Sequence, residues 1–321
     1  MDLAVGKPLS ANRRLSLLAR IVGAESELKK KDALQGYLFA LPWIIGLVVF
    51  VAGPILVSVY LSLNDYSVLS GATWVGLANY RRAFLEDPLF WPSLGRTLYY
   101  AGAVVPISLV GSLLLATLLN QKLRGTNAFR SLFFLPHLTP TVALAVLWSW
   151  LLHPHLGPVN MVIQALGLEP YPFLTTRQTV IPSMIMISTW SSVGGNNMLI
   201  FLAGLQGVPA ELYEAADIDG ASSARKFLNI TLPMISPSIL FNLVMGIIGA
   251  LKVFGLAYVA TNGGPNYGSW FFALHIYSQA FAYFRLGYGS ALAWFFAAIL
   301  IVFTMIQLRL SNRWVFYAGA N

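Results

Sequence analysis

Long apolar runs separated by short polar segments dominate the pattern of the chain. Six runs reach the length of about 20 residues that an α-helix needs to cross the hydrocarbon core of a bilayer. The pattern therefore predicts an all-α polytopic membrane protein with six transmembrane helices. The predicted spans are about 37–63, 97–119, 132–152, 180–204, 236–260 and 288–308.

Two features interrupt this pattern without changing the prediction. Pro42, Pro54 and Pro106 lie inside predicted spans, where neighbouring helices can satisfy the carbonyl groups that a proline frees. The segment 270–283 is apolar but too short to span, so it is interpreted as an interfacial or re-entrant segment.

Composition agrees with a membrane protein, since 57% of the residues are hydrophobic and only 10% are charged. A soluble domain has about 25% charged residues. Fourteen of the 20 Lys and Arg lie in the basic tail 1–36, the loops 120–131 and 205–235 and the C-terminal end, and five lie on the other side. The positive-inside rule places the first group in the cytoplasm. Both termini, 1–36 and 311–321, are therefore predicted to be cytoplasmic, and the net charge of +8 indicates membrane orientation rather than nucleic-acid binding.

The cytoplasmic loop 205–235 follows the residue preferences of a helix, a sharp turn and a second helix. Pro209 suits the first position of a helix. Gly220 is placed for a left-handed stop. Ser222 or Ser223 can cap the next helix, which Pro233 helps to end before the fifth span.

The composition of this loop leaves two interpretations open. Its alanines permit close approach by another protein, and its acidic residues stand on the side that otherwise favours positive charge. One interpretation is a helix that docks in a cleft of a cytoplasmic partner. The other is an amphipathic interfacial hairpin with a solvated acidic face.

The segment EAADIDGASSARKFLNITLP, at 214–233, resembles the EAA loop of permease subunits in binding-protein-dependent ABC importers. Other stretches resemble the carbohydrate-uptake branch of that family, among them VGLANYRRAF (75–84), TNGGP (261–265) and LGYGSALAW (286–294). WVFYAG (314–319) is similar to a subset associated with oligosaccharide uptake. The residues that carry the EAA resemblance are Glu214, Ala215, Ala216, Asp219, Gly220, Ala221, Phe227, Ile230, Leu232 and Pro233.

The resemblance implies a type I ABC-importer-like permease in the inner membrane of a prokaryote. Such a permease is not itself an enzyme. It pairs with a second homologous permease, two ATPase subunits that hold ATP and magnesium, and an extracytoplasmic solute-binding protein. It also implies that the EAA residues Glu214 to Ala216 and Asp219 to Ala221 couple the permease to the ATPase. The family's usual acidic residue in the fifth span is Gly255 here, so no role of that acid is transferred.

The residues alone support a division of labour between chains. The sequence contains no G-x-x-x-x-G-K-[ST] motif, so no phosphate-binding loop of the usual ATPase type is expected in this chain. Without cysteine and without a plausible His/Glu cluster, no cofactor or metal site is expected either.

Candidate substrate-path residues lie in the fourth and fifth predicted spans. Trp190, Ser191, Asn196 and Asn197 belong to the most polar stretch of any span. Hydroxyl, amide and aromatic groups suit a neutral sugar, but small and hydroxyl residues also serve helix packing. Lys252 is the only charged residue well inside a span. It therefore faces the path, extends its ammonium group to the outer surface or has a structural partner.

Other functions remain open at this point. A solitary ion-coupled secondary carrier could use a broken binding-site helix, although the spans offer no acidic residue for a proton relay. An ABC permease could instead serve a non-sugar solute such as glycerol-3-phosphate. A membrane scaffold that recruits a soluble partner through the loop 205–235 is the third alternative.

Overall fold

The computed structural model describes residues 27–67, 71–121 and 125–316, and the chain divides into two units, through Tyr60 and from Leu61 onward. The first unit holds α2 (Glu27–Leu47), the π-helical turn η1 (Val48–Ala52) and most of α3 (Gly53–Ser62). Leu34–Ser62 is apolar and long enough to span a bilayer, in agreement with the first predicted span. The helix already begins at Glu27, inside the predicted tail 1–36, of which 1–26 lie outside the described residues.

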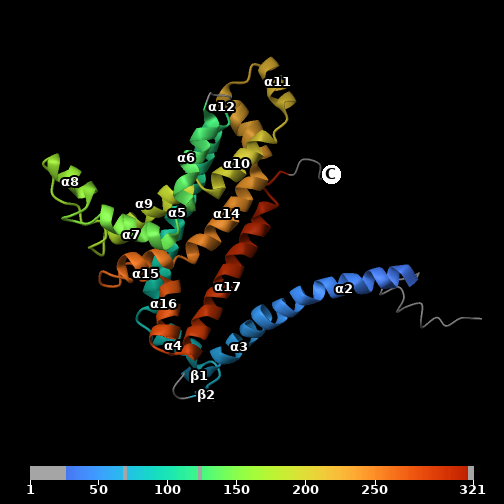
Figure 1. Cartoon of the computed structure of the whole chain (residues 1–321). Helices are drawn as coiled ribbons and strands as arrows, with labels where there is room; N and C mark the ends of the chain where they lie inside the picture. The colour runs from blue at the N-terminus through green and yellow to red at the C-terminus, as the bar shows by residue number, and fades with distance from the viewer. Residues whose placement is uncertain (1–26, 68–70, 122–124, 317–321) are drawn as a thin grey trace, which may run out of the picture. The chain divides into compact units, whose positions relative to one another are not determined.

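Three long apolar helices form the frame of the second unit (Figure 1). They are α5 (Phe90–Leu119), α14 (Ser236–Leu251) with its extension α15 (Gly255–Thr261), and α17 (Leu286–Ser311). α5 packs against α14 on one side and against the helices of the fourth predicted span on another. Polar side chains of α5 therefore meet those of several other helices inside the unit.

Two predicted spans are divided into separate helices at a proline or at a pair of glycines. The span predicted at 132–152 consists of α6 (Thr126–Leu138) and α7 (Thr141–Leu151), which meet at an angle of 92°. Pro140 causes this bend, because the residue before a proline is forced into extended conformation and a helix ends there. The span predicted at 180–204 is α9 (Val180–Val193) followed by α10 (Asn196–Gln206), with a break at Gly194–Gly195. Within the described residues, four helices are long and apolar enough to cross a bilayer, and the bent pair is a fifth candidate.

Small elements lie at opposite ends of the second unit (Figure 1). At one end β1 (Asn64–Ser67) pairs antiparallel with β2 (Gly71–Trp74), followed by α4 (Ala78–Leu85). At the other end lies the hairpin 205–235, the coupling hairpin that the resemblance implies (Figure 1). α8 (Pro158–Ala165) follows the bent pair. The helices of the coupling hairpin are α11 (Ala210–Ile218), α12 (Ser223–Lys226), the π-helical turn η2 (Phe227–Thr231) and α13 (Leu232–Met234).

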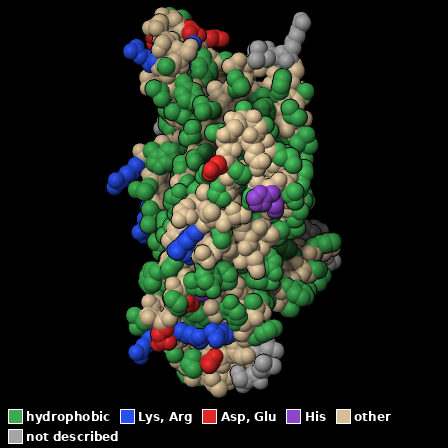
Figure 2. Space-filling view, turned by 90° about the vertical axis from the view of Figure 1, so that its left-hand side faces the viewer, with side chains coloured by type: hydrophobic (Ala, Val, Ile, Leu, Met, Phe, Trp, Pro, Cys, Tyr) green, Lys and Arg blue, Asp and Glu red, His purple; other side chains and the backbone are tan. Residues whose placement is uncertain are grey.

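The segment predicted as interfacial or re-entrant, 270–283, begins in the core. It contains α16 (Phe272–Tyr277) and the π-helical turn η3 (Ser278–Ala282). Phe271, Phe272 and Leu274 are fully buried, and α16 packs against α5 and α17. The first half of the segment therefore packs against protein, whereas Phe281 and Tyr283 at its end are 60% and 54% exposed. Figure 2 shows the contrasting outside, a largely hydrophobic face on which charged side chains are few and scattered.

A buried hydrogen-bond network joins three segments at the end opposite the coupling hairpin. Tyr288 Oη donates to Asp87 Oδ2 over 2.6 Å, and His275 Nε2 lies 2.8 Å from the same oxygen. The Trp270 indole donates to His275 Nδ1 over 3.1 Å. An indole N–H can only donate, so Nδ1 is the acceptor and the imidazole proton that faces Asp87 is on Nε2. The network ties the start of α5 to α16 and α17.

The charge of Asp87 is stabilised in this network. Burial alone would raise the pKa of Asp87, but hydrogen bonds from His275 and Tyr288 outweigh it and lower the pKa from 3.8 to about 2. A carboxyl group with a lowered pKa stabilises the fold above its unfolded-state pKa. That contribution disappears as the pH falls through the folded-state pKa.

We expect Asp87→Asn to lower the melting temperature at pH 7 by several degrees, because a hydrogen bond to a charged group contributes about 1.5–3 kcal/mol. The difference from the wild type should shrink as the pH falls from about 4 toward 2, where the wild-type carboxylate also becomes neutral. Thermal unfolding in detergent measures both effects. Glu86→Gln changes an exposed neighbouring acid and serves as the control. Equal differences at pH 7 and at pH 3 would contradict this account of the network.

Candidate functional site

A polar cavity of about 400 Å³ lies between α5, α9, α14 and the bend of α6 and α7. Ser188, Ser191 and Ser192 line it from α9. Their spacing of three and four residues places these hydroxyls on one face of the helix. From α14, Asn242, Met245, Gly246 and Gly249 line the opposite wall with the same periodicity.

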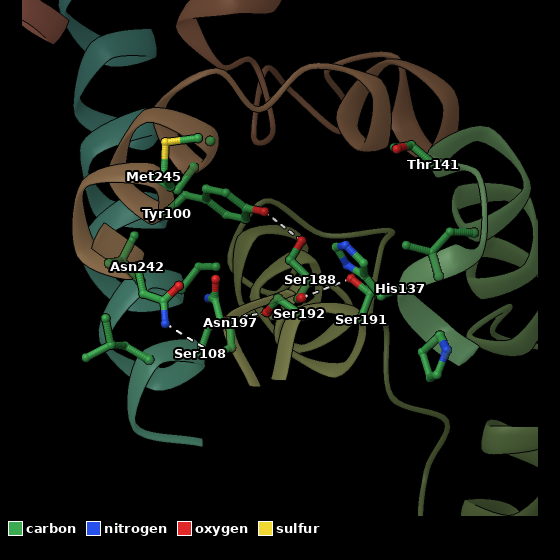
Figure 3. A pocket seen from close by; sticks show the side chains of 18 of the residues that line it. Tyr100, Ser108, His137, Thr141, Ser188, Ser191, Ser192, Asn197, Asn242 and Met245 are labelled. Carbon is green, nitrogen blue, oxygen red and sulfur yellow. Dashed lines mark hydrogen bonds between the residues drawn. The ribbon is translucent and has the colours of Figure 1, made fainter. Parts of the chain in front are cut away.

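Two short hydrogen bonds join α5 to α9 across this cavity (Figure 3). Tyr100 Oη donates to Ser188 Oγ over 2.6 Å. Ser108 Oγ and Ser192 Oγ are also 2.6 Å apart. Residues 100 and 108 are two turns apart on α5, so both bonds lie along one face of each helix. They fix the relative register of the two helices that form the wall.

Asn242 offers the cavity an unsatisfied acceptor. Its side chain is 1% exposed, and its Nδ2 donates to the carbonyl oxygen of Asn197 over 3.2 Å. Its Oδ1 has no hydrogen-bond partner in the described protein. Buried polar atoms are usually satisfied, so this buried oxygen has the capacity to accept from a donor, such as a hydroxyl group, once a movement of the wall exposes it.

A second cavity of about 430 Å³ adjoins the first and shares His137, Ser192, Asn197 and Asn242 with it. Asn196 lines this second cavity. The donors and acceptors of both walls are hydroxyl, amide and imidazole groups. No group of three or more His, Asp or Glu that could hold a metal ion occurs in the part of the chain that the structure describes.

The break between α9 and α10 allows a close approach to α6. A Cβ atom on Gly194 would overlap the carbonyl oxygen of Phe133, and one on Gly195 would lie 2.6 Å from His137 Nδ1. Only glycine lets the backbone come this near. Close packing and a helix break therefore occur together at these two residues.

The structure separates the predicted path residues into two groups. Ser191 and Asn197 line the main cavity, and Asn196 lines the adjoining one. Trp190 packs edge to face on Trp148, with 5.4 Å between ring centroids, and lies outside the set of residues that line either cavity.

Lys252 does not line the cavities, but it is exposed on the continuation of their wall. It is the C-terminal cap of α14, three residues beyond Gly249, and residues three apart share a helix face. No carboxylate of the described residues forms an ion pair with it. The backbone leaves the helix between Lys252 and Gly255, and such breaks at membrane depth occur where protein or a water-filled cavity covers them.

The coupling hairpin folds as the sequence predicts. Gly220 adopts a left-handed φ of 69°, and Ala221 N donates to Ala216 O over 2.9 Å, closing the helix as a Schellman motif does. Ser222 caps α12 by accepting from Arg225 N. Two details differ, since Pro209 precedes the first helical residue and Pro233 lies inside α13.

The face of α11 that carries the EAA residues is open to solvent. Glu214, Ala215 and Asp219 are exposed, and Ala216 is half-buried. The neighbouring Ile218 is 88% exposed. α11 therefore offers a surface of small, apolar and acidic side chains that nothing in the second unit covers.

Comparison with known proteins decides the family. Residues 107–316 match the family described as binding-protein-dependent transport system inner membrane component. The chain belongs to this family. It is accordingly a multi-pass permease of the inner membrane with the type I importer fold.

Individual relatives extend the match to nearly the whole chain. The probable ABC transporter permease protein YesP of Bacillus subtilis (strain 168) is 37% identical over 90% of this chain and 94% of its own. The arabinooligosaccharides transport system permease protein AraP of the same organism is 36% identical, covering 86% and 88%. A chain of a bacterial alginate ABC transporter, solved with an alginate pentasaccharide-bound periplasmic protein, superposes with a TM-score of 0.78. That chain is 26% identical, over 88% of this chain and 96% of its own.

Several polar cavity residues escaped prediction from the sequence, among them Tyr100, Ser108, His137 and Asn242. A signal exists for some of them. Asn242 is the one amide inside the fifth predicted span, and polar residues in a span usually face the protein interior. The pairing of Tyr100 and Ser108 with serines of α9 depends on the register between helices, which no local pattern encodes.

We expect Gly194→Ala to prevent correct packing of α6 against α9 and α10, because its Cβ would meet a backbone atom that no rotamer change can move. The cost of such overpacking is about 1–3 kcal/mol or more. Gly102→Ala is the matched control, since nothing lies within 4 Å of its Cβ. Recovery from the membrane and melting temperature compare the two variants. A Gly194→Ala protein as stable as Gly102→Ala would refute the close approach.

Proposed function

We propose that this chain is one of two permease subunits of an ATP-driven importer for a carbohydrate, specifically an oligosaccharide. A second homologous permease, two ATPase subunits and an extracytoplasmic solute-binding protein complete the assembly. The observation that carries the proposal is the polar, uncharged cavity in a chain of this permease family. AraP is named for arabinooligosaccharides, and the alginate structure contains a pentasaccharide-bound protein.

The chemistry of the cavity supports a hydroxyl-rich substrate. A sugar presents many donors and acceptors at short spacing, and the cavity offers serine hydroxyls and the free acceptor of Asn242. Ser191, Asn196 and Asn197 form part of this path. Lys252 stands where the same wall continues beyond the cavity, and we assign it to the path as well, since a lipid-facing ammonium group is costly.

The coupling hairpin supports a separate ATPase. Its exposed residues Glu214, Ala215, Asp219 and Gly220 form the docking surface in this proposal, together with Ala216 and Ala221. ATP and magnesium are held by the partner, since this sequence has no phosphate-binding loop of the usual type. Closure of the ATPase pair would displace α11 and open the cavity outward.

The first test uses the whole assembly, co-expressed and reconstituted in vesicles. We expect one sugar-loaded binding protein to stimulate ATP hydrolysis and to drive sugar uptake, within a panel of neutral and acidic oligosaccharides and glycerol-3-phosphate. The double variant Glu214→Ala/Gly220→Pro should lose both, because proline cannot adopt the φ of 69° at position 220.

Three outcomes would contradict the proposal. Ion-driven uptake by this chain alone, indifferent to ATP, would identify a secondary carrier. Stimulation and uptake with glycerol-3-phosphate alone would exclude a carbohydrate as the substrate. An assembled complex that transports no solute with any binding protein would favour the alternative that this chain is a membrane scaffold.

A second prediction separates the path from coupling. We expect Asn242→Leu to lower the initial rate of uptake about tenfold, because it removes both the free acceptor and the donor to Asn197. Stimulation of ATP hydrolysis by the loaded binding protein should persist. Ser112→Ala, a buried change on α5 outside the cavity wall, should leave uptake within about twofold of the wild type. Equal uptake by Asn242→Leu and the wild type would exclude this wall from the path.

A further inference from the structure

Two side-chain pairs cross the coupling hairpin and join its arms. Tyr213 Oη on α11 lies 2.8 Å from Thr231 Oγ1 at the end of η2. Nearer the tip, Lys226 Nζ donates to Asp217 Oδ1 over 2.6 Å. Residues 213 and 217 are four apart on α11, so they share one face of that helix.

The π-helical turn η2 places Lys226 and Thr231, the partners of Asp217 and Tyr213, on the same side of their arm. Lys226 and Thr231 are five residues apart, and in an unbroken α-helix they would point about 140° away from each other. In this chain Leu232 N donates to Phe227 O, five residues earlier. The wider turn places Lys226 and Thr231 on the side that faces α11. π-helical turns inside α-helices often occur at functional sites, and here the turn serves pairing across the hairpin.

The arm that receives these pairs is continuous with a cavity wall. Thr231 is 5% exposed and is followed by α13 and then α14. Ile235, at the junction, is fully buried in a cluster with residues of α5 and α10. α14 then supplies Asn242, Met245 and Gly249 to the cavity. A force on α11 that passes through Tyr213 and Thr231 therefore reaches the cavity through one run of helices.

We propose that Tyr213 and Thr231 are positioning residues that transmit displacement of α11 to α14. Asp217 and Lys226 form a second contact between the same two arms, nearer the tip of the hairpin. This inference rests on the proposed function, since it requires an ATPase that moves α11. The pair near the root carries most of the effect. Asp217 is 61% exposed at its side chain, and exposed ion pairs contribute little.

The test compares the ratio of sugar taken up to ATP hydrolysed in the reconstituted complex. We expect Tyr213→Phe and Thr231→Val each to lower this ratio about three- to tenfold, the effect of one lost hydrogen bond on an equilibrium. Thr231→Ser keeps the hydroxyl and should retain the ratio. The double variant should be no worse than either single variant, because both remove the same bond.

A matched control removes a hydroxyl that bonds only within its own helix. Thr117 Oγ1 donates to Leu113 O on α5, so Thr117→Val should leave the ratio unchanged. A purely structural role of Tyr213 and Thr231 would lower the yield of complex, with uptake and hydrolysis falling together. An unchanged ratio in Tyr213→Phe, or additive losses in the double variant, would overturn the inference.

If Thr231→Val reduces assembly of the complex, the ion pair of Asp217 and Lys226 provides a second test of the same ratio. Asp217→Lys should lower the ratio, and Asp217→Lys/Lys226→Asp should restore it. A loss of docking contacts would not be restored by the second substitution. Failure of the double variant to restore the ratio would therefore count against transmission between the two arms. A wild-type complex without ATP-driven uptake would refute the proposed function and the inference with it. Normal wild-type uptake with unaltered ratios in all variants would refute the inference alone.

Discussion

Hydrocarbon offers no hydrogen bonds, so every backbone group freed by a helix break inside a membrane span must find a partner in the protein or in enclosed water. This constraint explains where the second unit places its irregular backbone. The break at Gly194–Gly195 packs against the last turns of α6, just before the break at Thr139–Pro140, since Gly194 lies against Phe133 and Gly195 against His137. The polar cavity lies beside these breaks. Irregular backbone and polar side chains are thereby concentrated in one place that the long helices enclose.

The frame that encloses them is fixed at two levels. Along its length, α5 bonds to α9 through Tyr100–Ser188 and Ser108–Ser192. At the end opposite the coupling hairpin, Asp87 accepts hydrogen bonds from groups on α16 and α17. These contacts involve residues 84 to 201 positions apart. They hold α5, α9, α16 and α17 together, whereas the contacts of α14 with the cavity include glycine and an unpaired amide oxygen. Within the described residues, one side-chain hydrogen bond, from Asn242 Nδ2 to Asn197 O, joins α14 to α10 beside the cavity, so a movement of α14 there would break few buried polar bonds.

The residue types along short segments made the positions of most helices and the shape of the coupling hairpin predictable. The apolar runs located the helices, and Gly220 and Ser222 located the turn and the cap of the coupling hairpin, because turn and cap preferences depend on a few adjacent residues. The bend before α7 was missed, although the proline that causes it is visible in the sequence. Trp190 was grouped with its polar neighbours, yet it lies on another face of α9, against Trp148. Tyr100 could not be placed, since its role depends on how distant helices pack, whereas the place of Asn242 inside a span was a signal that the prediction left unused.

α14 connects the coupling hairpin physically to the cavity. Its first turn follows the junction at Ile235, which is buried with the ends of α5 and α10, so the junction can act as a fixed point. Displacement of Thr231 on one side of that point would move Asn242 and Met245 on the other. The cavity hydroxyls of α9 are held by α5 and would stay in place. The same movement would change the distance between Asn242 and the serines of α9, and with it the fit of any hydroxyl-rich molecule between them. A small displacement at the coupling hairpin can therefore alter the hydrogen bonding of a substrate near the middle of the helices.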